Sequence, residues 1–260
     1  MSEYTIDGQD LDDPQGRWRL TNATSLPTWG APRLPNVEVP GRIGVLPLPP
    51  TSAAPATLVL GLLVQADDQK RATLDQNLRA LAALLRPFGR LLRVTHRPAG
   101  APVREATARL SGSVEPKFFP AAVAATVSVS LELPEGVWRD PVPTEMAAAD
   151  LSKIDGGAMP ISDAVILVAS PGSPVKITDQ GSGGSMTWSG VVPPGKALLL
   201  EPALYRASFT AGSWSRSGAV DASSGLSLSA GGFSITPDTS GHHAVTVTGG
   251  TAQIRARRAY

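Results

Sequence analysis

Only one segment of this 260-residue chain has the periodicity of an amphipathic helix, and this scarcity limits the fold more than any other feature. The helix is expected over residues 67–85, where leucines recur at intervals of three or four residues and so share one face. These leucines are Leu74, Leu78, Leu81 and Leu85. Pro87 and Gly89 follow directly and end the helix. A helical bundle is therefore excluded.

Most of the remaining chain has the patterns of β-strands. Over residues 127–133, aliphatic side chains alternate with Ser and Glu, which is typical of a strand with one buried face. Residues 58–64 form a continuous apolar run, as in a strand buried on both faces. The strands expected in the N-terminal part cover residues 58–64, 91–96, 106–111 and 127–133.

The pattern changes around residues 141–160, where prolines and small residues interrupt the alternation. We expect a domain boundary here, with one domain at 1–148 and a second at 149–260. In the second domain, short strands about 8–12 residues apart are typical of a β-sandwich. They are expected at residues 164–169, 175–178, 186–191, 197–200, 204–209, 226–230, 244–248 and 251–257. Gly249-Gly250 predicts a tight hairpin between the last two strands, because the turn needs positive φ.

Composition excludes several classes of protein. The formal net charge of +1 argues against non-specific nucleic-acid binding as the main function, and no specific nucleic-acid binding is expected. The absence of cysteine excludes disulfides and thiolate chemistry. No apolar run approaches the roughly 20 residues of a membrane span. Residues 1–13 are acidic and interrupted by Gly8, unlike a secretory signal. We therefore expect a soluble protein made in a cytoplasm.

The motifs of common enzymes are missing from the sequence. There is no G-x-S-x-G, H-E-x-x-H or P-loop, and the glycine-rich residues 181–185 lack the lysine that a phosphate loop needs. The chain is therefore expected not to be an enzyme and to need no cofactor.

Metal binding is not expected either. The acidic cluster of Asp10, Asp12 and Asp13 lacks the glycine and the distal glutamate of a calcium loop. His242 and His243 are adjacent, so on a strand they would point to opposite faces, and we expect a surface pair. The remaining histidine, His96, is expected to be structural.

The aromatic residues of the second domain allow two interpretations. Trp188 and Trp214, with Tyr205, would form part of the core, as tryptophans in sandwiches usually do. Alternatively, they would stack against sugar rings at the edge of the sandwich.

Across nearly the whole chain, the order of several segments resembles that of a known family. The segments are residues 6–13 (IDGQDLDD), 33–42 (RLPNVEVPGR), 133–140 (LPEGVWRD), 186–190 (MTWSG) and the arginine-rich end at 245–260. Together they resemble the distal tail protein of long-tailed phages with siphovirus-type tails, often labelled a minor tail protein. One departure is that no acidic residue follows Arg42.

This resemblance implies a mainly β, two-domain fold. The first domain would be a β-barrel-like belt with one helix, similar to tail-tube subunits, and the second a jelly-roll or galectin-like sandwich. Six copies would form a homo-hexameric ring in the virion, assembled in the host cytoplasm. The ring would join the tail tube protein to the tail-tip hub, with the tape measure protein as a further possible neighbour.

A ring needs two different complementary faces on each subunit. The proline-punctuated segment 29–50 is a candidate for such a contact, with Trp29, Val37, Val39 and Arg42 as contact residues. Alternatively, this segment only wraps around its own domain. Two other functions also compete with the structural one: a carbohydrate-binding module or adhesin acting through the sandwich, and a polysaccharide-degrading enzyme.

Overall fold

The computed structural model describes residues 2–25, 27–28, 30–32, 36–38, 43, 45–47, 53–86, 89–120, 123–230 and 232–260, with only the backbone of 36–38 and 45–47. The chain forms two compact units, Met1–Pro141 and Val142–Tyr260. The sequence placed the boundary after residue 148. The contacts place it after Pro141, because β11 (Thr144–Ala147) pairs with β20 (Thr251–Ala256) of the second unit.

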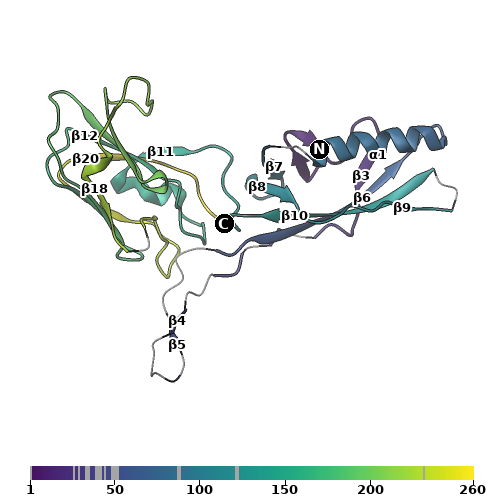
Figure 1. The fold of residues 1–260 in the computed structure, drawn as a ribbon, viewed down its shortest axis with the longest axis horizontal. Coiled ribbons are helices and arrows are strands. Elements are labelled where there is room, and N and C mark those ends of the chain that lie inside the picture. Colours follow the sequence, from purple (N-terminus) through teal and green to yellow (C-terminus); the bar gives the residue numbers. More distant parts are fainter. Residues whose placement is uncertain are drawn as a thin grey trace. The chain divides into compact units, whose positions relative to one another are not determined.

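The N-terminal unit is built on an eight-stranded antiparallel sheet (Figure 1). Seven of its strands have the order β2-β1-β7-β8-β10-β6-β3, and the eighth, β9, pairs with β10. Its strands are β1 (Tyr4–Ile6), β2 (Gln9–Asp10), β3 (Trp18–Leu20), β6 (Ala56–Gln65), β7 (Leu92–His96), β8 (Arg104–Leu110), β9 (Lys117–Phe118) and β10 (Ala124–Leu133). β6 and β10 pair along their full length. A separate two-stranded ribbon contains β4 (Asn36–Glu38) and β5 (Val45–Pro47).

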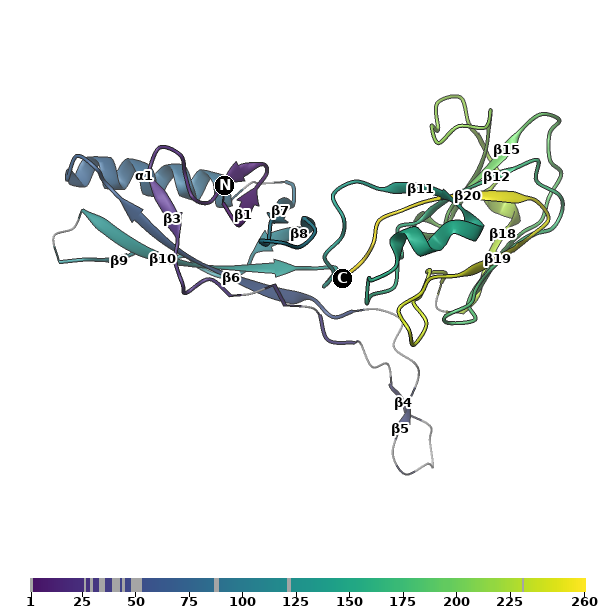
Figure 2. The ribbon, with the colours of Figure 1, turned by 180° about the vertical axis from the view of Figure 1, so that it is seen from behind.

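The core of this unit lies between the sheet and the single helix, α1 (Arg71–Leu85), which runs along one side of the sheet (Figures 1 and 2). Alternate residues of β10 are buried, as its period-2 pattern predicts. The apolar run in β6 was expected to be buried on both faces, but Val59 and Leu63 are only half-buried, so one face of β6 is more exposed than predicted. On α1, the buried leucines are Leu74, Leu81 and Leu85. Asn77 on the same face donates a 2.7 Å hydrogen bond to the Gln65 carbonyl at the end of β6, which fixes the helix to the sheet.

The helix ends at Leu85 as predicted but begins four residues later than expected, at Arg71 rather than Asp67. The reason is local: Gln69 has φ +56°, a left-handed conformation that a helix cannot contain. Asp68 stabilises the turn before the helix by accepting hydrogen bonds from the Lys70 N–H (3.1 Å) and the Thr73 hydroxyl (2.9 Å). None of the helices within the described ranges has the length and apolar character needed to span a membrane.

The C-terminal unit has two antiparallel sheets (Figure 2). The six-stranded sheet has the order β11-β20-β12-β15-β16-β17, with β12 (Val165–Ala169), β15 (Ala197–Glu201), β16 (Arg206–Thr210) and β17 (Val220–Asp221). The four-stranded sheet has the order β18-β14-β13-β19, with β18 (Leu226–Leu228), β14 (Ser185–Trp188), β13 (Val175–Asp179) and β19 (Val245–Thr248). Three short 3-10 helices complete the unit: η1 (Ala148–Ile154), η2 (Pro202–Leu204) and η3 (Ser223–Gly225).

The two sheets form a sandwich with apolar side chains between them. The Trp188 ring on β14 meets Phe209 on β16 edge to face, with 5.4 Å between the ring centroids. The mainly β fold, with one α-helix in the first unit and a sandwich in the second, is therefore confirmed.

The predicted hairpin at Gly249-Gly250 is wrong. β19 pairs with β13 and β20 pairs with β12, so the two glycines carry the chain from one sheet to the other. A Cβ on Gly249 would lie 2.2 Å from the Pro174 carbonyl oxygen, and both glycines have positive φ. The glycine pair marks a tight connection, but the sequence does not show which strands it joins.

Candidate assembly surfaces

The segment that carries the predicted ring contacts is joined to the rest of the N-terminal unit at a closely packed base. The Gly30 N–H donates to the Gly136 carbonyl at 3.0 Å. A Cβ at Gly30 or at Gly136 would lie 2.0 or 2.1 Å from the Ala54 carbonyl oxygen, so both positions require glycine. We call residues 29–54 the arm. Its base is fixed to the unit by backbone contacts.

Beyond this base, β4 and β5 pair with each other and lie away from the main sheet of the unit (Figure 1). Of the four predicted contact residues, Val37 lies in β4 opposite Leu46, where only the backbone is described. The other three, Trp29, Val39 and Arg42, lie outside the described residues. Between the two strands, Ile43 is fully exposed, a residue that the sequence analysis did not single out.

One edge of the main sheet is closed by the chain itself. Ser25 binds Val59 of β6 through its own N–H (2.8 Å) and through its hydroxyl, which accepts the Val59 N–H at 3.0 Å. Thr24 accepts the Gly61 N–H at 3.1 Å, and the Thr28 hydroxyl donates to the Thr57 carbonyl at 2.7 Å. Edge strands invite pairing with other chains unless they are covered. A neighbouring molecule therefore cannot extend the sheet along this part of β6.

A second exposed apolar feature of this unit lies at β9. Phe118 and Phe119 are each about half exposed, and the Arg71 guanidinium lies 4.0 Å from the centroid of the Phe118 ring. Neither phenylalanine was predicted to be a contact residue. Two adjacent phenylalanines in the sequence nevertheless indicate an exposed ring, because adjacent residues on a strand point to opposite faces and both cannot enter one core.

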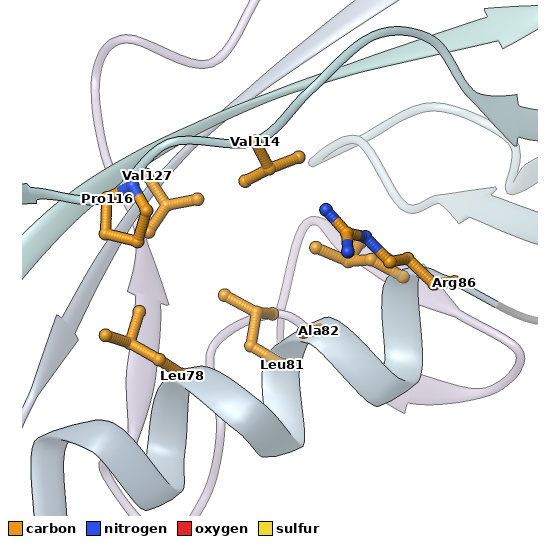
Figure 3. Close-up of a pocket in the computed structure, with 8 residues that line it drawn as sticks. Leu78, Leu81, Ala82, Arg86, Val114, Pro116 and Val127 are labelled. Atoms are coloured by element: carbon orange, nitrogen blue, oxygen red, sulfur yellow. The ribbon is translucent and has the colours of Figure 1, made fainter.

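A small hollow lies between α1 and the segment that leads from β8 to β9 (Figure 3). Its lining is apolar apart from Arg86 and comprises Leu78, Leu81, Ala82, Leu85, Val114, Pro116 and Val127. The volume of about 90 Å³ is well below the roughly 300 Å³ of small-molecule sites. We interpret it as incomplete packing at the helix.

The three candidate sugar-stacking residues lie in different environments. Trp188 is 2 % exposed and its Nε1 donates to the Ala222 carbonyl at 2.8 Å, so it is a core residue and its role as a stacking platform is excluded. Trp214 is half-buried on the outer face of the six-stranded sheet. Tyr205 is exposed in the turn after η2.

The acidic cluster near the N-terminus serves the fold. Asp13 is buried and accepts two hydrogen bonds from the Arg17 guanidinium, both at 2.9 Å. These bonds lower the pKa of the Asp13 carboxyl. Asp10 binds Arg97 at 3.1 Å, and Asp12 accepts the Leu20 N–H at 2.9 Å. The three aspartates therefore bind three different partners within the fold.

The expectation of a surface histidine pair holds for one residue of the two. His242 is exposed, whereas the His243 side chain is fully buried. Both rings face Asp155, with Nδ1 of His242 2.6 Å from Oδ2 and Nδ1 of His243 3.3 Å from Oδ1. Burial works to raise the pKa of Asp155, but the hydrogen bonds from both histidines outweigh it and the pKa is lowered. The hydrogen bond to Asp155 raises the pKa of His242.

His96 has the structural role that was expected. Its buried ring stacks on Tyr4 at 4.6 Å, and Nε2 lies 3.0 Å from Glu3 Oε1. Burial raises the pKa of the Tyr4 hydroxyl. Among the residues that the structure describes, no group of three or more His, Asp and Glu side chains is arranged to hold a metal ion.

Comparison with known proteins was made with sequence and with structure. No family model matches the chain, and no curated protein matches it in sequence. Among solved structures, the Dit (gp 19.1) protein of phage SPP1 matches with a TM-score of 0.62 at 13 % identity, over 99 % of this chain and 98 % of that one. That protein is described as a paradigm of the hub adsorption apparatus in phages that infect Gram-positive bacteria.

A chain of the phage P2 baseplate in its activated conformation with calcium aligns with a TM-score of 0.41 at 10 % identity, over 98 % of this chain and 97 % of that one. The SPP1 likeness extends through both units. The chain therefore has, from end to end, the fold of a phage distal tail protein.

Proposed function

We propose that this chain is a structural protein of a phage tail tip, which acts as a distal tail protein in the virion. Six copies would form a ring that joins the tail tube to the tail-tip hub. The observation that carries the proposal is the fold likeness to SPP1 Dit over 99 % of the chain, which includes the helix-bearing sheet and the sandwich in the same order.

The surfaces of the N-terminal unit support an assembly role. A ring requires head-to-tail contacts, and hence two different patches on each copy. The apolar side chains that this unit exposes include Ile43 in the arm and Phe118 with Phe119 at β9, which lie at different places in the chain. In the proposal, the arm with Trp29, Val37, Val39 and Arg42 contacts a neighbouring copy.

The proposal gives no side chain a catalytic role. Two polar clusters with reactive groups support this, because each joins parts of the fold. Asp13 binds Arg17, and Asp155 binds both His242 and His243. Carboxylates paired in this way orient the backbone around them, which is a structural use of charge.

The mass of the purified full chain across a concentration series tests the proposal. The expected result is a species with six times the mass of one chain. The fraction of the protein in this species is expected to increase as the concentration rises. A chain that stays monomeric throughout would contradict ring formation.

Variants of the arm test its role separately. Deletion of residues 29–50 and the point change Ile43→Asp are both expected to abolish the large species. Val191→Asp is the matched control, because Val191 is also highly exposed but lies in the C-terminal unit. A folded deletion variant that still forms rings would eliminate the arm contact.

A further inference from the structure

The two adjacent phenylalanines at β9, Phe118 and Phe119, are 46 % and 48 % exposed, although burial of an aromatic ring is favourable. We call this pair the aromatic patch. Leu91 and Val103 of the same unit are also exposed, but each stands alone in the sequence, and scattered apolar residues are common on protein surfaces. Two neighbouring exposed rings instead indicate a surface that another molecule covers.

The aromatic patch is held in position by its surroundings. The Arg71 guanidinium, 4.0 Å from the centroid of the Phe118 ring, also forms a 3.1 Å ion pair with Asp75 on α1. The Phe119 N–H donates to the Ala124 carbonyl of β10 at 3.1 Å. These contacts fix the patch before a partner arrives, and such preorganisation lowers the entropic cost of binding.

Side-chain packing is favoured over strand addition as the way in which copies meet here. β9 has only two residues and already pairs with β10. The nearby edge of β6 is covered by Ser25 and Thr28. On the arm, Pro47 lies in β5 and has no N–H to donate to a further strand.

The arm has the composition that suits an aromatic surface. Proline-rich segments dock against exposed aromatic rings in several recognition domains, because their preformed backbone loses little conformational entropy on binding. The 26 residues of the arm contain six prolines and three charged residues: Pro32, Pro35, Pro40, Pro47, Pro49, Pro50, Arg33, Glu38 and Arg42.

The arm also needs a surface to cover it. Among the described strands, β4 and β5 pair only with each other. A two-stranded ribbon without a packing partner is at best marginally stable in water. Ile43, between the two strands, is fully exposed and is available for such a contact.

The arm and the aromatic patch are attached at opposite ends of β10. Gly136, which binds Gly30 of the arm, donates its N–H to the carbonyl of Leu133, the last residue of the strand. Phe118 pairs with Ala125 near the other end (Figure 2). From Ala125 to Leu133 the strand rises about 26 Å, at about 3.3 Å per residue. One copy can therefore present its patch to one neighbour and its arm to another.

We propose that the arm of one copy packs against the aromatic patch of the next copy, with Ile43 lying against Phe118 and Phe119. This inference rests on the proposed function, because it supplies the two complementary surfaces that a head-to-tail ring requires. The occupant of the patch is thus a second copy of this chain.

Cross-linking between single-cysteine variants tests this contact, because the chain itself contains no cysteine. Ile43→Cys and Lys117→Cys chains are mixed as dilute protomers, concentrated and treated with a short bismaleimide. Lys117 is exposed beside the patch, so its replacement keeps both aromatic rings. Each chain carries one thiol, so every product joins two copies. The expected main product joins one chain of each variant, as identified by mass spectrometry of the linked peptides.

Val191→Cys takes the place of Ile43→Cys in the control mixture, because Val191 is also highly exposed but belongs to the C-terminal unit. Rings that form with no more mixed product than in this control would overturn the inference and leave the proposed ring intact; the patch would then belong to the tail tube or the hub. A main product of two Ile43→Cys chains would also overturn it. A wild-type chain that stays monomeric at every concentration would contradict the ring and the contact together.

Assembly of Phe119→Ala measures the contribution of the patch while keeping the contact between Arg71 and Phe118. The concentration at which half of the protein is assembled is expected to rise at least about tenfold. Leu204→Ala is the matched control, because Leu204 is exposed in the C-terminal unit, and it should stay within about twofold of the wild type.

Thermal unfolding of both variants separates assembly from folding. A Phe119→Ala chain that unfolds at the wild-type temperature and assembles at the wild-type concentration would overturn the role of the patch. If Phe119→Ala unfolds early, the cross-linking of Ile43→Cys with Lys117→Cys, in which both rings are kept, decides the question.

Discussion

At the scale of single residues, Asp13 shows what the acidic cluster does. Its buried carboxylate accepts hydrogen bonds from Nε and Nη2 of the Arg17 guanidinium and also accepts one from the Arg17 backbone N–H at 3.1 Å. The sequence shows three closely spaced acids but does not show that Arg17 turns back onto one of them. The calcium-loop alternative was rejected on motif grounds, and the contacts give the physical reason for the cluster.

We predict that Asp13→Asn lowers the free energy of unfolding by about 1.5–3 kcal/mol, because hydrogen bonds to a buried charge are lost. Denaturant unfolding of the full chain measures this. Asp75→Asn is the control: Asp75 pairs with Arg71 on the exposed side of α1, so a loss of about 0.5 kcal/mol or less is expected. Equal effects of the two changes would contradict the structural role of Asp13.

The second residue-scale prediction concerns pH. The folded-state pKa of His242 is raised above 6.5 by Asp155, so its stabilising contribution is fully present below that value and is lost as the pH rises through the folded-state pKa. We expect His242→Gln to lower the unfolding temperature relative to wild type at about pH 5 and to have little effect at about pH 9. The measurement is thermal unfolding at both pH values. A difference that is the same at both would contradict the assignment.

At the scale of elements, the long strands were the most predictable. β6, β7, β8 and β10 were each expected within two or three residues of their observed bounds. Alternation indicated β8 and β10, and a continuous apolar run indicated β6. The short strands β1, β2 and β3 were not predicted, because two or three residues carry no measurable period. Sheet membership was also not predictable: the Gly249-Gly250 pattern is local, whereas the partners of β19 and β20 lie far away in the sequence.

The covered edge of β6 gives an element-scale prediction. Ser25→Ala removes the acceptor for the Val59 N–H, and an unsatisfied donor of this kind costs about 1–3 kcal/mol. Exchange of the Val59 amide hydrogen should therefore be at least about fivefold faster than in wild type. Thr28→Val is the control, because Thr28 donates to the Thr57 carbonyl and should leave Val59 unchanged. Unchanged exchange at Val59 in Ser25→Ala would show that the hydroxyl does not protect this edge.

At the scale of the whole molecule, the order of local patterns was more informative than any single motif. One helix among strands, followed by a β-rich second half, predicted the architecture that the two units have. The candidate sites were less predictable. Trp188 belongs to the core, and a hollow on the six-stranded sheet combines Glu201 with Arg255 from strands separated by β12 in the sheet. Such a combination depends on long-range register, which composition and spacing do not contain.

In the proposed function, copies of this chain assemble into a ring by matching different faces of neighbouring subunits. Electron microscopy of the purified full chain at high concentration tests it most directly. Closed rings with sixfold symmetry and a central opening are expected in the micrographs. Isolated protomers, or two-fold dimers built from the same patch on both copies, would contradict it.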